Sequence, residues 1–107
     1  MDNQSYVDFA RGQIEWHEKQ NAFCRRQIDW CNRDIKRTRA HDKEIAEYAL
    51  SCEPDNPLTV KIFGGKYISD DTRKLMNERA KYYREIKYNN KRIEHFKKQV
   101  EQYSLNR

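Results

Sequence analysis

Residues 9–36 read FARGQIE WHEKQNA FCRRQID WCNRDIK, four consecutive blocks of seven residues. Each block opens with phenylalanine or tryptophan, and isoleucine occupies the sixth place in three of them. Seven residues make nearly two turns of an α-helix, so equivalent places of successive blocks lie along one face. The repeat therefore predicts a long helix with an aromatic stripe and a separate isoleucine stripe.

The same period continues outside the four blocks. With Val7 as position a of a heptad, mostly apolar or small side chains recur at positions a and d as far as Ala49 and Cys52. All the cysteines fall on the d line: Cys24, Cys31 and Cys52. Small buried side chains pack well beside bulky neighbours, so we expect reduced, buried thiols on a seam facing a second helix.

The ends of this first helix are marked by local signals. Ser5 and Asp8 have the spacing of a capping box, and the two prolines of residues 53–57 require a loop. The polar stretch 38–42 contains no glycine or proline, so we expect the helix to continue through it. These signals predict a first helix over about residues 5–52.

Residues 58–68 have the composition of a short β-hairpin. Leu58 to Phe63 is rich in residues that favour strands, and Gly64-Gly65 would allow a tight turn before a returning strand at residues 66–68. Because two strands are seldom stable alone, Val60, Ile62 and Tyr67 are expected to pack on the helices or to pair with another chain.

A second helix is predicted over about residues 70–103. Ser69-Asp70-Asp71 supplies capping oxygens and negative charge at its start, and the helix contains no glycine or proline. The sequence thus predicts a mainly α, coiled-coil-like antiparallel helical hairpin that forms one domain over residues 1–107. The apolar arc of the first helix covers nearly half its circumference and needs two neighbours, which favours a helical bundle built by a homodimer.

Composition and charge indicate the cellular compartment in which the protein is expected. The chain has 107 residues and a net charge of +5, and 36% of its residues are charged. It contains no apolar run long enough to span a membrane, and residues 1–4 lack the basic start of a signal peptide. We therefore expect a cytoplasmic protein that does not bind membranes.

No pattern for catalysis, a cofactor or a metal is present in the sequence. Gly64-Gly65-Lys66 lacks the leading glycine and the following Ser or Thr of a phosphate loop. His17, Cys24 and Cys31 share one line, but two helical turns, ~10 Å, separate successive members. We expect no enzyme activity, cofactor or metal, although a metal- or redox-linked dimer through Cys24 or Cys31 remains a second alternative.

The aromatic stripe is the predicted partner-binding site. It comprises Phe9, Trp16, Phe23 and Trp30. Such a stripe is typical of a packed core or a dimer interface. A target-binding surface and a base-stacking platform beside arginines are the alternatives.

Basic residues concentrate in two segments, residues 25–39 and residues 81–98, and these are the candidate nucleic-acid contacts. They are Arg25, Arg26, Arg33, Arg37, Arg39, Lys81, Arg84, Lys87, Lys91 and Lys98. On the second helix they form a face that could follow a phosphate backbone, although acidic residues are interspersed.

These observations favour a non-enzymatic, macromolecule-binding accessory protein that docks on nucleic-acid-processing machinery through its helical surfaces. Small size and high charge suit a phage or mobile-element origin. Direct binding of DNA or RNA by the basic faces is the alternative function.

Overall fold

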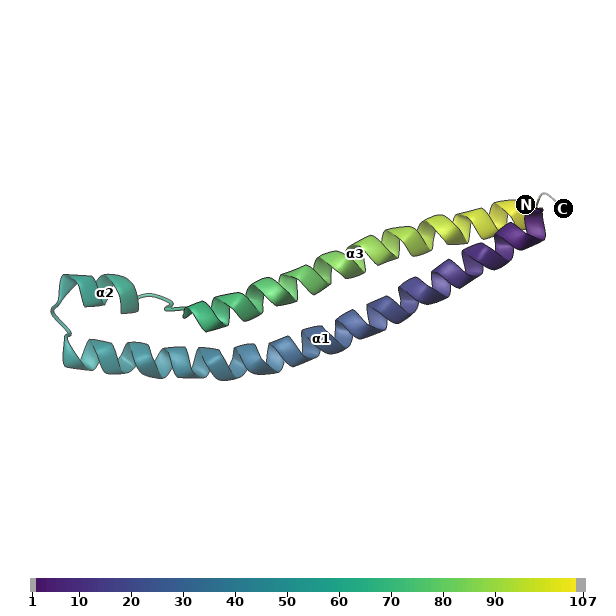
Figure 1. The fold of residues 1–107 in the computed structure, drawn as a ribbon. Helices are drawn as coiled ribbons and strands as arrows, with labels where there is room; N and C mark the ends of the chain where they lie inside the picture. The colour runs from purple at the N-terminus through teal and green to yellow at the C-terminus, as the bar shows by residue number, and fades with distance from the viewer. Residues whose placement is uncertain (1, 106–107) are drawn as a thin grey trace. The chain divides into compact units, whose positions relative to one another are not determined.

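The computed structural model describes residues 2–105, which form three helices: α1 (Asn3–Cys52), α2 (Pro57–Phe63) and α3 (Asp70–Leu105) (Figure 1). Two compact units divide the chain. Unit 1 joins α1 up to Ile28 with α3 from Ala80 onward, and unit 2 comprises Asp29–Arg79. Each unit pairs a part of α1 with a part of α3, so the predicted helical hairpin is confirmed.

Helix α1 begins slightly earlier than predicted and does not break. The amide of Ser5 donates a hydrogen bond of 2.7 Å to the Asp2 carboxylate, so Asp2 rather than Ser5 supplies the capping oxygen. The helix continues through residues 38–42 and ends at Cys52. Continuity through this polar stretch agrees with the absence of helix-breaking residues there.

The predicted β-hairpin is wrong, because residues 57–63 form helix α2 and no strand occurs within residues 2–105. The Asn56 side chain accepts hydrogen bonds from the amides of Leu58 and Thr59, and Pro57 occupies the first turn. An asparagine cap followed by proline is a strong helix start, and it outweighs the strand preference of the β-branched residues. The helix ends at Phe63 and is capped by Gly64, whose amide donates a hydrogen bond to the Val60 carbonyl.

The glycine at the end of α2 has a steric role that differs from the predicted hairpin turn. Neither Gly64 nor Gly65 adopts a positive φ angle. A Cβ atom on Gly64 would instead collide with the backbone carbonyl of Val60. Val60 and Ile62 are exposed, so of the two predicted alternatives they do not pack on the long helices, and pairing with another chain stays a prediction.

Helix α3 begins at Asp70, as the sequence predicts. The Ser69 hydroxyl accepts a hydrogen bond of 3.3 Å from the Thr72 amide, and the Ser69 carbonyl accepts one from Arg73. Asp70 and Asp71 place negative charge in the first turn, where it interacts favourably with the helix dipole.

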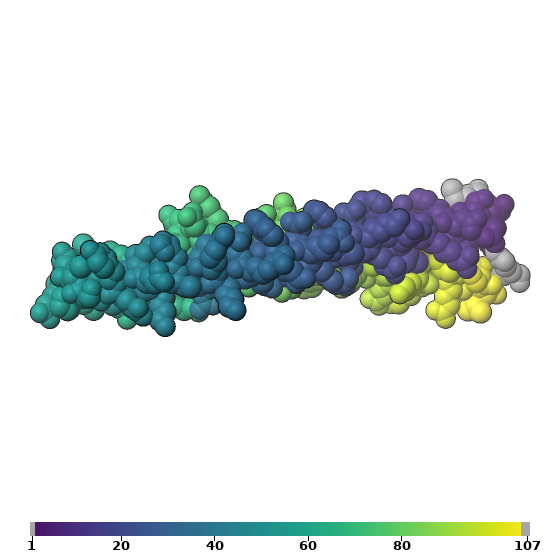
Figure 2. Space-filling model, turned by 90° about the horizontal axis from the view of Figure 1, so that it is seen from below, coloured from purple at the N-terminus to yellow at the C-terminus, as the bar shows by residue number. Residues whose placement is uncertain are grey.

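The core of unit 1 is the predicted seam between antiparallel helices. The ring of Tyr6 lies 4.5 Å from that of Tyr103, and Phe9 contacts Phe96 edge to face. Figure 2 shows the N-terminal part of α1, in purple, packed against the C-terminal part of α3, in yellow. The buried residues of α1 here all occupy heptad positions a and d: Val7, Ala10, His17, Asn21, Cys24 and Ile28.

The core of unit 2 is smaller and more polar. Cys31, Ile35 and Ala46 are its buried apolar residues on α1, whereas Asp42 and Thr72 are buried polar ones. Cys52, expected on the buried d line, is exposed at the end of α1. The expectation of buried cysteines therefore holds for Cys24 and Cys31 and fails for Cys52.

Candidate binding surfaces

The aromatic stripe of unit 1 is only half covered. Phe9, Trp16 and Phe23 are 50%, 53% and 43% exposed, and we call these three residues the aromatic ridge. One edge of the ridge meets α3, through Phe9 with Phe96 and Phe23 with Tyr82 at ring-centroid distances of 6.2 and 6.3 Å. The other part of each ring faces solvent. The ridge is thus neither a closed core nor a set of isolated surface residues.

The fourth predicted aromatic, Trp30, belongs to unit 2. Its side chain is 48% exposed, so it is as accessible as the three rings of the ridge. All four predicted partner-binding residues are exposed, so no core within this single chain encloses them.

A line of glutamines accompanies the ridge. Gln13, Gln20 and Gln27 follow the aromatics at a spacing of four residues and are half-buried. Residues four apart are neighbours on a helix surface, so each amide lies beside an aromatic ring. Together the ridge and these glutamines form a strip without a charged side chain, on a chain in which 36% of residues are charged.

The basic candidates of unit 1 are exposed. Arg25 and Arg26 project from α1, and the others lie on α3: Lys81, Arg84, Lys87, Lys91 and Lys98. A spacing of seven residues places Arg84, Lys91 and Lys98 on one line of that helix. Lys98 forms an ion pair of 3.1 Å with Glu94. The basic residues of α3 thus lie on the exposed surface of that helix.

Unit 1 contains a polar contact layer that was not predicted from the sequence. The Nδ1 atom of His17 lies 2.8 Å from the Asn89 amide oxygen, and the Asn21 side chain donates a hydrogen bond of 2.9 Å to Asn90. The Oδ1 atom of Asn21 is buried without a hydrogen-bond partner. The heptad pattern places His17 and Asn21 on the seam, but only the pairing across helices shows which polar residues of α3 they meet.

The two buried thiols, Cys24 and Cys31, have raised pKa values. Burial first, and then the hydrogen bond of 3.3 Å to the Glu85 carboxylate, raises the pKa of the Cys24 thiol to about 11. Burial and then the charge of Glu78 also raise the pKa of Cys31. Reactive thiolates are disfavoured at both positions. Among the described residues, no three His, Cys, Asp or Glu side chains are placed to hold a metal ion.

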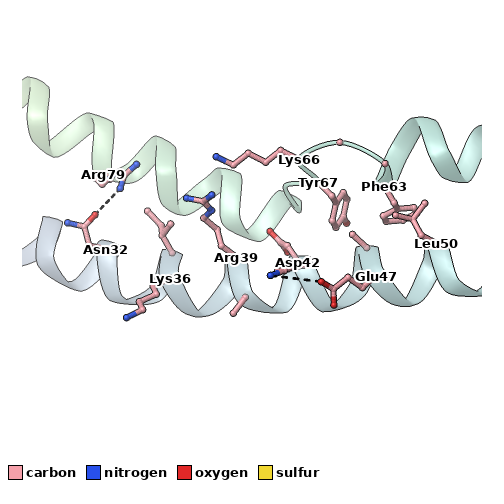
Figure 3. Close-up of a pocket in the computed structure, with 16 residues that line it drawn as sticks. Asn32, Lys36, Arg39, Asp42, Glu47, Leu50, Phe63, Lys66, Tyr67 and Arg79 are labelled. Carbon is pink, nitrogen blue, oxygen red and sulfur yellow. Dashed lines mark hydrogen bonds and ion pairs between the residues drawn. The ribbon is translucent and has the colours of Figure 1, made fainter.

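Unit 2 contains an open groove of about 740 Å³, which we call the basic groove (Figure 3). One wall is α1 between Asn32 and Leu50, and the other is formed by residues 63–67 with Arg79 of α3. Five basic side chains line it: Lys36, Arg39, Lys43, Lys66 and Arg79. Its apolar lining comprises Ile35, Ala40, Ala46, Leu50, Phe63 and Tyr67.

Only one residue of the basic groove, Arg39, was a predicted site residue. Arg37 lines a separate hollow of about 310 Å³ and forms an ion pair of 3.1 Å with Asp34, and Arg33 is exposed outside both. The helical spacing of Lys36, Arg39 and Lys43 could have placed them on one face. The wall that faces them depends on α2, a segment for which the sequence predicts a strand.

Within the described residues, none of the helices combines the length and the apolar content that crossing a bilayer requires. No known protein family, curated protein or solved structure matches this chain.

Proposed function

We propose that this protein is a non-enzymatic accessory protein that self-associates through the aromatic ridge and binds a further macromolecule through its charged surface. The observation that carries the proposal is the exposure of about half of Phe9, Trp16 and Phe23. Large apolar side chains that are grouped on the surface of a protein usually mark an interaction site. Tryptophan in particular contributes strongly to binding free energy at interfaces.

A second copy of the chain is the partner that fits the chemistry of the ridge. The residues run Phe9, Trp16, Phe23, so the order is the same in either direction along the helix. The neighbouring glutamine amides both donate and accept hydrogen bonds, so they can pair with the same amides of another copy. No charge on this strip demands a partner of opposite sign. A symmetric dimer therefore satisfies every group that the strip presents.

Light scattering on the purified full chain tests self-association. We expect a dimer for the wild type and weakening by about thirtyfold or more for Trp16→Glu, because a charge would be buried in the interface. Tyr83→Glu is the matched control, since Tyr83 is also 53% exposed and lies on α3 outside the ridge. Circular dichroism confirms that each variant is helical. A monomeric wild type, or equal masses for both variants, would refute the proposal.

The charged surface supports docking on nucleic-acid-processing machinery, and direct nucleic-acid binding is the second candidate function. It is favoured by the basic face of unit 1, where Lys81, Arg84, Lys87 and Lys91 are exposed and, within residues 2–105, form no ion pair within 4.0 Å. Such a face attracts phosphates regardless of base sequence.

Gel shifts with a DNA duplex and with an RNA strand at two salt concentrations test this second function. Neutralising these four residues to glutamine should abolish binding that is strong at low salt and weak at high salt. Affinity that ignores salt, or that survives the substitutions, would exclude the basic face as a nucleic-acid site.

A further inference from the structure

We propose that the basic groove of unit 2 binds an acidic peptide segment that carries large apolar side chains. This site is separate from the ridge of unit 1, and no part of the proposal depends on dimer formation. It rests on the charge of the groove, on the apolar character of its lining and on its shape.

The groove carries an excess of positive charge that is free for a ligand. Five basic side chains line it against two acids, Asp42 and Glu47. The Asp42 carboxylate already accepts hydrogen bonds from Ser69 and Thr72, and Glu47 lies 4.0 Å from Lys43. Both acids are thus engaged by groups of the protein itself.

The remaining cations lack an internal counter-charge. Within residues 2–105, Lys36, Arg39 and Lys66 form no ion pair within 4.0 Å. Arg79 donates a hydrogen bond of 2.8 Å to the Asn32 amide oxygen, a neutral partner, as the dashed line in Figure 3 shows. Carboxylates are therefore the groups that the groove complements.

The end of the groove that lies at Leu50 and Phe63 is apolar. Figure 3 shows Phe63, at the end of α2, beside Leu50 of α1, and the rings of Phe63 and Tyr67 have a centroid distance of 4.9 Å. Burying a Leu- or Phe-sized side chain of a ligand there would stabilise a complex by roughly 1.5–3 kcal/mol. The groove thus separates a basic region from an apolar one.

This separation favours a peptide over a nucleic acid. A nucleic-acid strand carries a charge on every unit, whereas the basic side chains of the groove do not extend to its end at Leu50 and Phe63, where the lining is apolar. The Phe63 and Tyr67 rings are half-buried and tilted by 57° against each other, an arrangement that differs from a row of open ring faces on which successive bases stack. The α1 wall, from Asn32 to Leu50, extends ~27 Å, the length of roughly eight residues of extended peptide.

Selection from a phage-displayed library of random twelve-residue peptides against the immobilised full chain tests the proposal. We expect enrichment of peptides that combine Asp or Glu with Leu, Phe or Trp. An enriched peptide, labelled with fluorescein, should lose about tenfold or more in affinity for Lys36→Glu/Arg39→Glu, measured by fluorescence anisotropy. Replacing its apolar residues with serine should weaken it similarly.

The matched control is Arg33→Glu/Lys61→Glu, which makes the same charge change at exposed residues of unit 2 outside the groove. It should reduce the affinity several-fold less than the groove variant, since Arg33 and Lys61 do not line the groove and salt partly screens their charges from the ligand. If the groove variant loses helicity, Lys66→Glu in the connection after α2 replaces it. The proposal is overturned by selected peptides without acids, by equal losses in groove and control variants, or by an oligothymidylate strand that displaces the peptide.

Discussion

The Thr72 hydroxyl at the start of α3 donates a hydrogen bond of 2.7 Å to the Asp42 carboxylate of α1. Both residues are buried, and the same carboxylate oxygen accepts a bond of 3.1 Å from the Ser69 amide. Asp42 thus extends the cap of α3 from a residue 30 positions away along the chain. A carboxylate at this position also interacts favourably with the helix dipole.

Removing the Thr72 hydroxyl should destabilise unit 2 with little change in side-chain volume. We expect Thr72→Val to lower the free energy of unfolding by about 1–3 kcal/mol, because a buried carboxylate loses a charged hydrogen bond. Urea denaturation followed by circular dichroism measures the change. Ser51→Ala removes an exposed hydroxyl from α1 and should cost less than about 0.5 kcal/mol. Equal effects of the two substitutions would contradict a structural role for the Asp42–Thr72 bond.

The Asp42 bond should make stability depend on acid pH. Burial alone would raise the pKa of Asp42, but the hydrogen bonds from Thr72 and Ser69 outweigh it and lower the pKa below the ordinary value of 3.8. The stabilisation is therefore fully present above this ordinary value and is lost as the pH falls through the lowered pKa.

The measurement is the free energy of unfolding of the wild type and of Asp42→Asn across the acid range. The wild type should be more stable at neutral pH, and the difference should shrink as the pH falls below about 4. A difference that stays constant down to the lowest accessible pH would show that ionisation of Asp42 does not contribute.

Leucine substitutions in the two polar pairs of unit 1 should have opposite effects on stability. Asn21→Leu should stabilise the protein by about 1 kcal/mol, since it removes an unpaired buried oxygen and leaves Asn90 exposed to water. His17→Leu should destabilise it by about 1–3 kcal/mol, because Asn89 is buried and would lose its partner. Thermal unfolding compares the two variants. Destabilisation of the same size by both would contradict this assignment.

The cysteines should differ in reactivity. With a pKa of about 11, Cys24 is a thiolate in only about one molecule in a thousand at pH 8, and it is also buried. Cys52 is exposed and should react with iodoacetamide at least about a hundredfold faster than Cys24 or Cys31. Peptide mass spectrometry after timed labelling measures this order, and labelling in urea provides the control. Simultaneous modification of Cys24 and Cys52 in the folded protein would be inconsistent with the buried position of Cys24.

The long helices could be predicted because their signals are local and repeated. The heptad pattern from Val7 to Ala49 determines which face of α1 is buried, and Ser69 to Asp71 mark the start of α3. Helix α2 was missed because Val60 and Ile62 favour strands, whereas the deciding feature is the Asn56 cap before Pro57. Strand preference depends strongly on context and gives way to such a cap.

Of the two candidate surfaces, the aromatic ridge could be predicted from the sequence and the basic groove could not. The aromatic ridge follows from spacing along one helix, and its residues were therefore predicted. The basic groove was not, because Lys66 and Phe63 reach it only when residues 57–63 are helical. The role of Asp42 was missed for a related reason, since its partners Ser69 and Thr72 belong to another helix and appear in the sequence only as local capping residues.

The polar pairs of unit 1 help to determine the register in which α1 and α3 pair. Helices with a heptad pattern can slide by seven residues and still bury apolar side chains, so such hairpins risk several near-equivalent registers. A slip of α3 by one heptad would replace Asn89 with Tyr82 or Phe96 opposite His17. The Nδ1 atom of His17 would then lose the amide oxygen that it meets in the observed register. The His17–Asn89 pair thus stabilises the observed register of α1 and α3 relative to registers shifted by seven residues.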